Sequence, residues 1–262
     1  MKIKPKKSLG QNFLIDKEVI KKILTCADVQ NKNILEVGPG TGNLTSEILK
    51  NNPKELILIE KDTYLLNLLR KKYTEKITFI NNDVLKISEN KLSNDKLTVF
   101  GNLPYNISTE ILIKWILNIN SNLWFDKLIL LFQKEVADRI ISNSNTSNYG
   151  RLSIISNWRL NVEKIIDVKP SSFKPKPKVE STLLLFTPKI KFFKLKNSRS
   201  IENVTRIFFN QKRKKIKKPL NKLFKNSDQI AKKLNLNLDL RPQNLDFQTY
   251  YMLAKELENL RS

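Results

Sequence analysis

The chain has 262 residues, a length that suits one domain of about 180–200 residues together with a smaller one. It contains no histidine and a single cysteine, which excludes a Ser-His-Asp triad, a histidine-ligated metal site, an internal disulfide bond and a zinc ribbon. The 48 Lys and Arg residues outnumber the 25 Asp and Glu residues and give a formal net charge of +23, which is expected to attract polyanions such as nucleic acid.

The amino-terminal residues are basic, but no apolar stretch follows them, so they do not resemble a secretory signal. No run of about 18 apolar residues occurs, and we expect no membrane span. We therefore expect a cytoplasmic protein, and nothing in the sequence requires more than a monomer.

Short apolar runs alternate with stretches of helical spacing up to about residue 190. The predicted strands are residues 33–37, 55–59, 77–80, 97–100 and 127–132. The predicted helices are residues 44–50, 62–73, 107–117 and 134–141. This alternation predicts an α/β fold, with a parallel, doubly wound sheet, helices on both faces and right-handed crossovers.

The later part of the chain changes character. Residues 162–168 and 181–186 resemble strands, and the proline-bearing stretch 169–178 between them would allow an antiparallel edge. After Pro188 the chain becomes rich in lysine, with helical periodicity near residues 201–209, 216–224 and 249–260. We therefore predict two domains, residues 1–188 with the sheet and residues 189–262 as a basic helical domain.

Three of the six glycines, Gly38, Gly40 and Gly42, alternate directly after the first predicted strand. Glycine permits positive φ and lets a ligand approach bare backbone. In a doubly wound sheet, ligands bind beyond the carboxyl ends of the strands. Three alternating glycines in a glycine-poor chain favour a ligand-binding loop over an ordinary turn.

The spacing of this loop bears on the ligand. A dinucleotide site needs a third glycine where this chain has Asn43, and the loop offers no basic residue to a pyrophosphate. The pattern Glu-x-Gly-x-Gly-x-Gly instead resembles the S-adenosylmethionine loop of class I methyltransferases, which have a Rossmann-like sheet. Glu60, at the end of the second strand, can accept hydrogen bonds from both ribose hydroxyls. Asp83, after the third strand, can accept from an adenine amine or can form a turn.

A second motif, Gly101-Asn102-Leu103-Pro104-Tyr105-Asn106, follows the fourth strand. It resembles the Asn/Asp-Pro-Pro-Tyr motif of enzymes that methylate an amino group conjugated to a planar ring. The Asn102 side-chain carbonyl and the Leu103 backbone carbonyl can accept the two N–H bonds of such an amine. Pro104 fixes the turn, and Tyr105 can stack on the base. Transfer would then be an in-line displacement that depends on positioning and needs no metal; an ordinary Asn-Pro turn is the alternative.

Several further segments, collinear with these motifs, resemble the KsgA (RsmA) family of small-subunit ribosomal RNA adenine dimethyltransferases. They are Ser8-Leu9-Gly10-Gln11-Asn12-Phe13-Leu14, Gln133-Lys134-Glu135-Val136-Ala137, Tyr149-Gly150-Arg151-Leu152-Ser153 and Phe173-Lys174-Pro175-Lys176-Pro177-Lys178-Val179. The resemblance implies transfer of methyl groups from S-adenosylmethionine to N6 of two adjacent adenosines, two per base, in a hairpin loop near the 3′ end of the small-subunit (16S) RNA. The partner would be small-subunit ribosomal RNA, free or in an immature 30S particle, during ribosome biogenesis.

The resemblance also assigns roles to single residues. Asn12 and Leu14 would close over the cofactor, and Phe173 would form a second aromatic face opposite Tyr105. Without the resemblance, Phe173 could be an ordinary anchor into the core. The remaining residues that would line the cofactor site are Gly38, Gly40, Glu60, Asp83 and Asn102.

The basic charge is concentrated in the tail. Between Glu202 and Asp228 there are nine basic residues and no acidic one, and apolar residues interleave with them. We expect this segment to contact RNA phosphates; a solvated charged face is the alternative. Where the family usually has arginine at position 212 this chain has lysine, which lacks the planar guanidinium fork. The expected RNA-binding residues are Arg206, Lys212, Arg213, Lys214 and Lys215.

Other functions remain open from the sequence. The same chemistry could act on a large-subunit ribosomal RNA adenine, although the amino-terminal match and the proline-rich loop favour the small subunit. A non-catalytic RNA-binding assembly or transcription factor would keep the fold, but the intact Asn102 and Tyr105 argue against lost chemistry. A nicotinamide dehydrogenase is disfavoured by Asn43.

Overall fold

The computed structural model describes residues 5–6, 9–73, 77–118 and 123–260. The chain divides into two compact units. The first comprises residues 1–114, 119–137 and 162–188, and the second comprises residues 115–118, 138–161 and 189–262.

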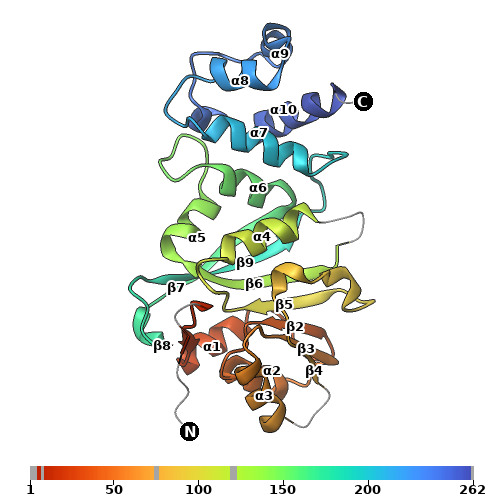
Figure 1. Cartoon of the computed structure of the whole chain (residues 1–262), viewed down its shortest axis with the longest axis vertical. Helices are drawn as coiled ribbons and strands as arrows, with labels where there is room; N and C mark the ends of the chain where they lie inside the picture. Colours follow the sequence, from red (N-terminus) through yellow and green to blue (C-terminus); the bar gives the residue numbers. More distant parts are fainter. Residues whose placement is uncertain (1–4, 7–8, 74–76, 119–122, 261–262) are drawn as a thin grey trace. The chain divides into compact units, whose positions relative to one another are not determined.

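The chain contains a seven-stranded sheet in the order β4-β3-β2-β5-β6-β9-β7 (Figure 1). Its strands are β2 (Asn33–Val37), β3 (Glu55–Ile59), β4 (Ile77–Ile80), β5 (Leu97–Gly101), β6 (Phe125–Gln133), β7 (Leu160–Val168) and β9 (Ser181–Pro188). The pairings from β4 to β6 are parallel, and β9 is antiparallel to β6. A separate two-stranded sheet pairs β1 (Phe13–Leu14) with β8 (Phe173–Lys174).

The two strands β2 and β5 form where the sequence is mainly apolar without alternation. All five residues of β2 are buried, as are all five of β5. A strand inside a parallel sheet is covered on both faces, and this favours a continuous apolar run. The helices that accompany the sheet are α1 (Lys17–Leu24), α2 (Asn43–Lys50), α3 (Thr63–Lys72), α4 (Ser108–Leu117) and α5 (Lys134–Ile141).

The order of the strands determines where a ligand can bind. The chain runs outward from β2 through β3 to β4 and then returns to place β5 on the other side of β2. The connections that leave β2 and β5 therefore diverge, which opens a crevice at their carboxyl ends. The residues that follow β2, β3, β4 and β5 all reach this edge of the sheet.

The second unit is helical, with α6 (Arg151–Arg159), α7 (Arg199–Phe209), α8 (Lys217–Leu223), α9 (Ser227–Lys233) and α10 (Phe247–Asn259). α7 contacts α6, α8 and α10, and an aromatic cluster that includes Tyr149 and Tyr250 lies in this unit. α10, at 13 residues, exceeds every other described helix in length. No helix in the described ranges is long and apolar enough to cross a membrane.

The predicted strands and helices are confirmed, with ends shifted by one or two residues. The division into units differs from the predicted boundary at residue 188, because residues 138–161 join the second unit, where α6 packs against α7 and α10. The sequence analysis did not identify α6. Six of its nine residues are buried, and a helix covered on most sides loses the polar stripe by which periodicity is recognised.

Candidate functional site

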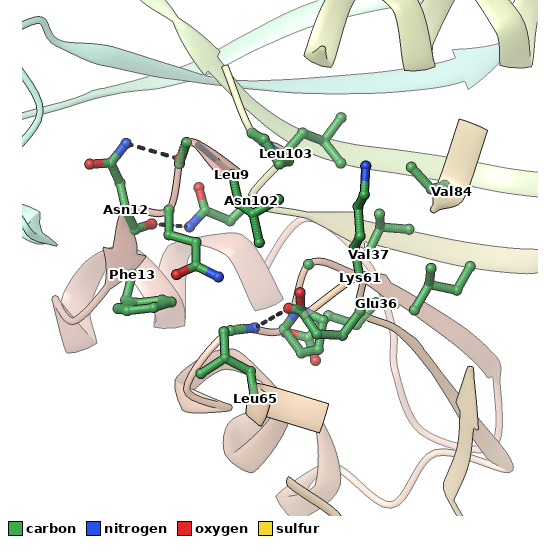
Figure 2. A pocket seen from close by; sticks show the side chains of 18 of the residues that line it. Leu9, Asn12, Phe13, Glu36, Val37, Lys61, Leu65, Val84, Asn102 and Leu103 are labelled. Atoms are coloured by element: carbon green, nitrogen blue, oxygen red, sulfur yellow. Dashed lines mark hydrogen bonds between the residues drawn. The ribbon is translucent and has the colours of Figure 1, made fainter. Parts of the chain in front are cut away.

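A pocket lies at the carboxyl ends of β2, β3, β4 and β5 (Figure 2). Its walls come from segments far apart in the sequence: the residues just before β1, the glycine loop after β2, and the turns after the next three strands. The parallel topology brings these segments together. All of the predicted cofactor-binding residues line it: Asn12, Leu14, Gly38, Gly40, Glu60, Asp83 and Asn102.

The glycine loop needs its glycines for close packing within the protein. Gly40 has a φ of +55°, and a Cβ atom there would lie 2.7 Å from Cδ1 of Phe13. Gly42 has a φ of +78°, and its Cβ would lie 2.7 Å from Cδ2 of Leu69 in α3. Both positions are therefore closed to larger residues by backbone conformation and by space.

Glu60 is held as a hydrogen-bond acceptor beside the loop. It is 8% exposed, and its two carboxylate oxygens accept from the backbone N–H groups of Gly40 at 3.2 Å and Asp62 at 2.9 Å. Burial raises the pKa of the Glu60 carboxyl, and the backbone hydrogen bonds oppose this rise only in part. Each carboxylate oxygen can accept a second hydrogen bond, so Glu60 can still receive a pair of hydroxyl donors.

Glu36, which the sequence analysis did not assign, is a second buried carboxyl in the pocket. It is 2% exposed and accepts a hydrogen bond of 2.6 Å from Oγ1 of Thr45. Burial raises its pKa to about 7, and the nearby charge of Glu60 adds to the rise. Glu36 is the glutamate that begins the Glu-x-Gly-x-Gly-x-Gly pattern, so the sequence did contain a signal for it. In the part of the chain that the structure describes, no group of three His, Cys, Asp or Glu residues could hold a metal ion.

Asp83 has partners on both carboxylate oxygens. One accepts from the backbone N–H of Leu85 at 3.0 Å, and the other accepts from Nζ of Lys61 at 2.8 Å. The Lys61 hydrogen bond is the main reason why the pKa of Asp83 is lowered. Asp83 thus forms the turn that the sequence suggested and also lines the pocket.

The turn after β5 forms the opposite wall. Asn102 donates from Nδ2 to the backbone carbonyl of Asn12 at 2.8 Å (Figure 2). The backbone N–H of Ile107 donates to the carbonyl of Pro104 at 3.1 Å and closes the turn. The Tyr105 phenol hydrogen-bonds to the Ser181 hydroxyl, and burial raises its pKa, which keeps it neutral. Four predicted catalytic residues therefore share one turn and one pocket: Asn102, Leu103, Pro104 and Tyr105.

Phe173, which the sequence analysis predicted to form a second aromatic face opposite Tyr105, has different surroundings from these four residues. Phe173 is 3% exposed, pairs with Leu14 in the β1–β8 sheet, and belongs to the apolar core that also includes Ile20 and Leu183. It does not line the pocket. These apolar surroundings fit the alternative, in which Phe173 anchors its loop in the core, and the second aromatic face stays a prediction.

The predicted RNA-binding residues lie in the second unit but differ in their surroundings. Lys212 donates to the backbone carbonyl of Ser147, and burial, with the charge of Arg139, lowers its pKa. Arg206 donates to the side chain of Asn203 at 2.8 Å, and Lys215 pairs with Asp239 at 2.7 Å.

Arg213 and Lys214 are exposed. Neither side chain forms a hydrogen bond or an ion pair with another residue that the structure describes. Of the five predicted RNA-binding residues, these two are therefore the most available to bind a phosphate group.

Comparisons with known proteins bear on the family of the chain. A family model described as ribosomal RNA adenine dimethylase matches residues 2–259. A protein of Pelagibacter ubique (strain HTCC1062) named ribosomal RNA small subunit methyltransferase A is 61% identical over 261 residues, which is 100% of both chains.

Solved structures share the fold. A dimethyladenosine transferase from Plasmodium falciparum has a TM-score of 0.77 and 28% identity over 94% of this chain and 98% of its own. The 23S rRNA methyltransferase ErmE has a TM-score of 0.68 and 22% identity over 94% of this chain and 100% of its own, and shows the fold alone. With a model that spans almost the whole chain and a full-length relative at this identity, the chain belongs to the ribosomal RNA adenine dimethylase family.

Proposed function

We propose that this protein transfers methyl groups from S-adenosylmethionine to N6 of two adjacent adenosines near the 3′ end of small-subunit ribosomal RNA, and forms N6,N6-dimethyladenosines. The observation that carries the proposal is the single pocket that joins the glycine loop and Glu60 to the turn from Asn102 to Tyr105. Family membership and the name of the 61% identical relative support it.

The pocket suits this cofactor. The lining contains three carboxyl groups, on Glu36, Glu60 and Asp83, against one lysine, Lys61, which pairs with Asp83. This balance favours the cationic sulfonium and ammonium groups and disfavours a pyrophosphate. Glu60 would accept from the ribose hydroxyls and Asp83 from the adenine amine. The other residues that would hold the cofactor are Asn12, Leu14, Gly38, Gly40 and Asn102. When bound, S-adenosylmethionine supplies an electrophilic methyl group and a good leaving group.

The acceptor turn would orient the substrate amine. The lone pair of the adenine N6 is delocalised into the ring, so the amine is a weak nucleophile. Oδ1 of Asn102 and the carbonyl of Leu103 would accept its two N–H bonds and direct the lone pair at the methyl carbon. The N6 nitrogen would bond to the methyl carbon as the bond from that carbon to the cofactor sulfur breaks, and the methylated amine would release a proton to solvent. The Tyr105 ring would stack on the extruded base.

The basic tail, residues 189–262, would bind the RNA backbone. Arg213 and Lys214 would contact phosphates, and Arg206 would do so with the guanidinium N–H groups that its hydrogen bond to Asn203 does not use. Lys212 and Lys215, which already have partners, would add long-range attraction. We expect the protein to work as a cytoplasmic monomer on an immature 30S particle.

A labelling experiment tests the proposal. Immature small subunits and large-subunit RNA are incubated separately with the protein and methyl-labelled cofactor, and the RNA is digested. We expect labelled dimethyladenosine in small-subunit RNA only, lost in Asn102→Ala and retained in Asn94→Ala, an exposed asparagine outside the pocket. Label in large-subunit RNA alone would assign the other substrate, and cofactor binding without any label would indicate a non-catalytic factor.

A further inference from the structure

The residues before α1 form an arm, residues 9–16, that is fastened to a buried carboxylate more than 50 positions away. Asp62 is 3% exposed; it accepts from Nε2 of Gln11 at 3.0 Å and from Nζ of Lys6 at 2.9 Å. Oε1 of Gln11 accepts from the backbone N–H of Lys6 at 2.7 Å and completes a closed ring of three hydrogen bonds. We call these three residues the clasp.

The fastened arm contacts both walls of the pocket. On the side of the glycine loop, Phe13 packs against Gly40, and Nδ2 of Asn43 donates to the Leu14 carbonyl at 2.7 Å. On the acceptor side, the carbonyl of Asn12 accepts from the Asn102 side chain. The clasp, the glycine loop and the acceptor turn are thus connected through eight residues of chain.

The bond to Asn12 decides which end of the Asn102 amide faces the pocket. An asparagine side chain has one donor group and one acceptor, and its terminal torsion is broad and nearly two-fold. With Nδ2 engaged by the arm, Oδ1 is left as the acceptor, and no residue that the structure describes donates a hydrogen bond to it. A flipped amide would turn its NH₂ group toward the substrate amine, where two donors repel.

We propose that Lys6, Gln11 and Asp62 are positioning residues for Asn102: the clasp closes the arm, and the closed arm sets the orientation of the Asn102 amide. The inference rests on the proposed function, in which Oδ1 of Asn102 receives the N6 amine. Gln11 also lines the pocket, but the clasp is proposed to act on Asn102 through the backbone of Asn12.

A swap of the clasp partners tests this. In Asp62→Asn, Oδ1 still accepts from the backbone N–H of Tyr64 and keeps the start of α3, but Nδ2 now faces the Gln11 donor. In Gln11→Glu, two carboxylates face each other. The double variant Gln11→Glu with Asp62→Asn restores a donor opposite an acceptor. Asp95→Asn, which loses an ion pair with Lys54 outside the pocket, is the matched control.

Three measurements are made on each variant of the full chain. Hydrogen exchange of a peptide covering residues 9–16, without cofactor, reports arm closure. The side-chain NH₂ resonances of Asn102, assigned by their loss in Asn102→Ala, report amide orientation. The kcat and the cofactor Kd separate positioning from binding. We expect each single variant to exchange faster, to shift the Asn102 resonances and to lose about ten- to hundredfold in kcat. The double variant should recover most of each loss, and Asp95→Asn should match the parent.

Two outcomes overturn the inference. Unchanged exchange in Asp62→Asn would mean that the clasp does not hold the arm. Faster exchange with unchanged Asn102 resonances and unchanged kcat would mean that the arm does not position the amide. A failure of the proposed function looks different: the parent protein itself would methylate no RNA, while exchange and the Asn102 resonances would still decide on the clasp.

Discussion

Glu36 should make the stability of the protein fall as the pH rises from about 4.5 to about 7. Its carboxyl has a pKa raised from 4.5 to about 7, mainly because burial disfavours the charged form. The folded protein therefore binds this proton more tightly than the unfolded chain does. Protonated Glu36 imposes no penalty below pH 4.5; above that value the unfolded chain ionises first, and stability is lost until the pH exceeds about 7. A shift of this size corresponds to about 3 kcal/mol.

The substitution Glu36→Gln isolates this effect. Glutamine keeps the size and can still accept from Thr45, but it does not ionise. Denaturant unfolding of both proteins between pH 4.5 and 8 gives the difference in unfolding free energy at each pH. Glu60 titrates in both proteins, so the difference reports chiefly Glu36. We expect Glu36→Gln to gain about 3 kcal/mol on the parent across this range.

Thr45→Val tests the direction of the effect, because it should shift the pH dependence of stability the opposite way from a lowered Glu36 pKa. The Thr45 hydrogen bond lowers the pKa of Glu36, so its removal should extend the loss of stability to higher pH. Parallel pH profiles for the parent and Glu36→Gln would refute the reasoning, because they would show that Glu36 has the same pKa in the folded and unfolded states.

Three further perturbations have expected outcomes. Gly40→Ala, at a φ of +55° and against the Phe13 ring, should cost about 2 kcal/mol by thermal unfolding and expose the arm to protease; an unchanged melting temperature would contradict it. Lys114→Met removes three hydrogen bonds that hold residues 84–89 beside the pocket, and should cost about 3 kcal/mol in denaturant unfolding, which an unchanged midpoint would exclude. Arg213→Ala with Lys214→Ala should reduce the slope of log affinity for small-subunit RNA against log salt by about 1.5; a constant slope would mean that both charges are merely solvated.

The sequence predicted the elements whose burial is continuous along the chain. β2 and β3 are recognisable in the sequence as apolar runs because both faces of the sheet are covered at these strands. Predicted cofactor-binding residues follow their carboxyl ends. Parallel topology was enough to predict that Gly38, Glu60 and Asn102 would meet. The positions of these three residues follow from local spacing and from the known geometry of parallel sheets, so they can be predicted from one sequence.

The features that the sequence did not predict depend on contacts between distant segments. Phe173 is buried because β8 pairs with β1 about 160 positions earlier, and nothing near Phe173 in the sequence records that pairing. Gln11 and Asp62 form the clasp across 51 positions. Asp62 is also the N-cap of α3, and this local role accounts for an aspartate at that position without any contact to Gln11.

The tether between the Tyr105 phenol and Ser181 has a consequence for how a nucleobase is chosen. A ring whose hydroxyl is already engaged offers only its flat face, and stacking on a flat face accepts any base. Discrimination between bases must then come from the two carbonyls of Asn102 and Leu103, which accept hydrogen bonds from an exocyclic amine and repel a keto oxygen. Uridine, with a keto oxygen, would not bind these two carbonyls, whereas the amine of cytidine would donate to both of them. The selection of a purine over a pyrimidine therefore depends on the shape of the RNA outside the catalytic turn.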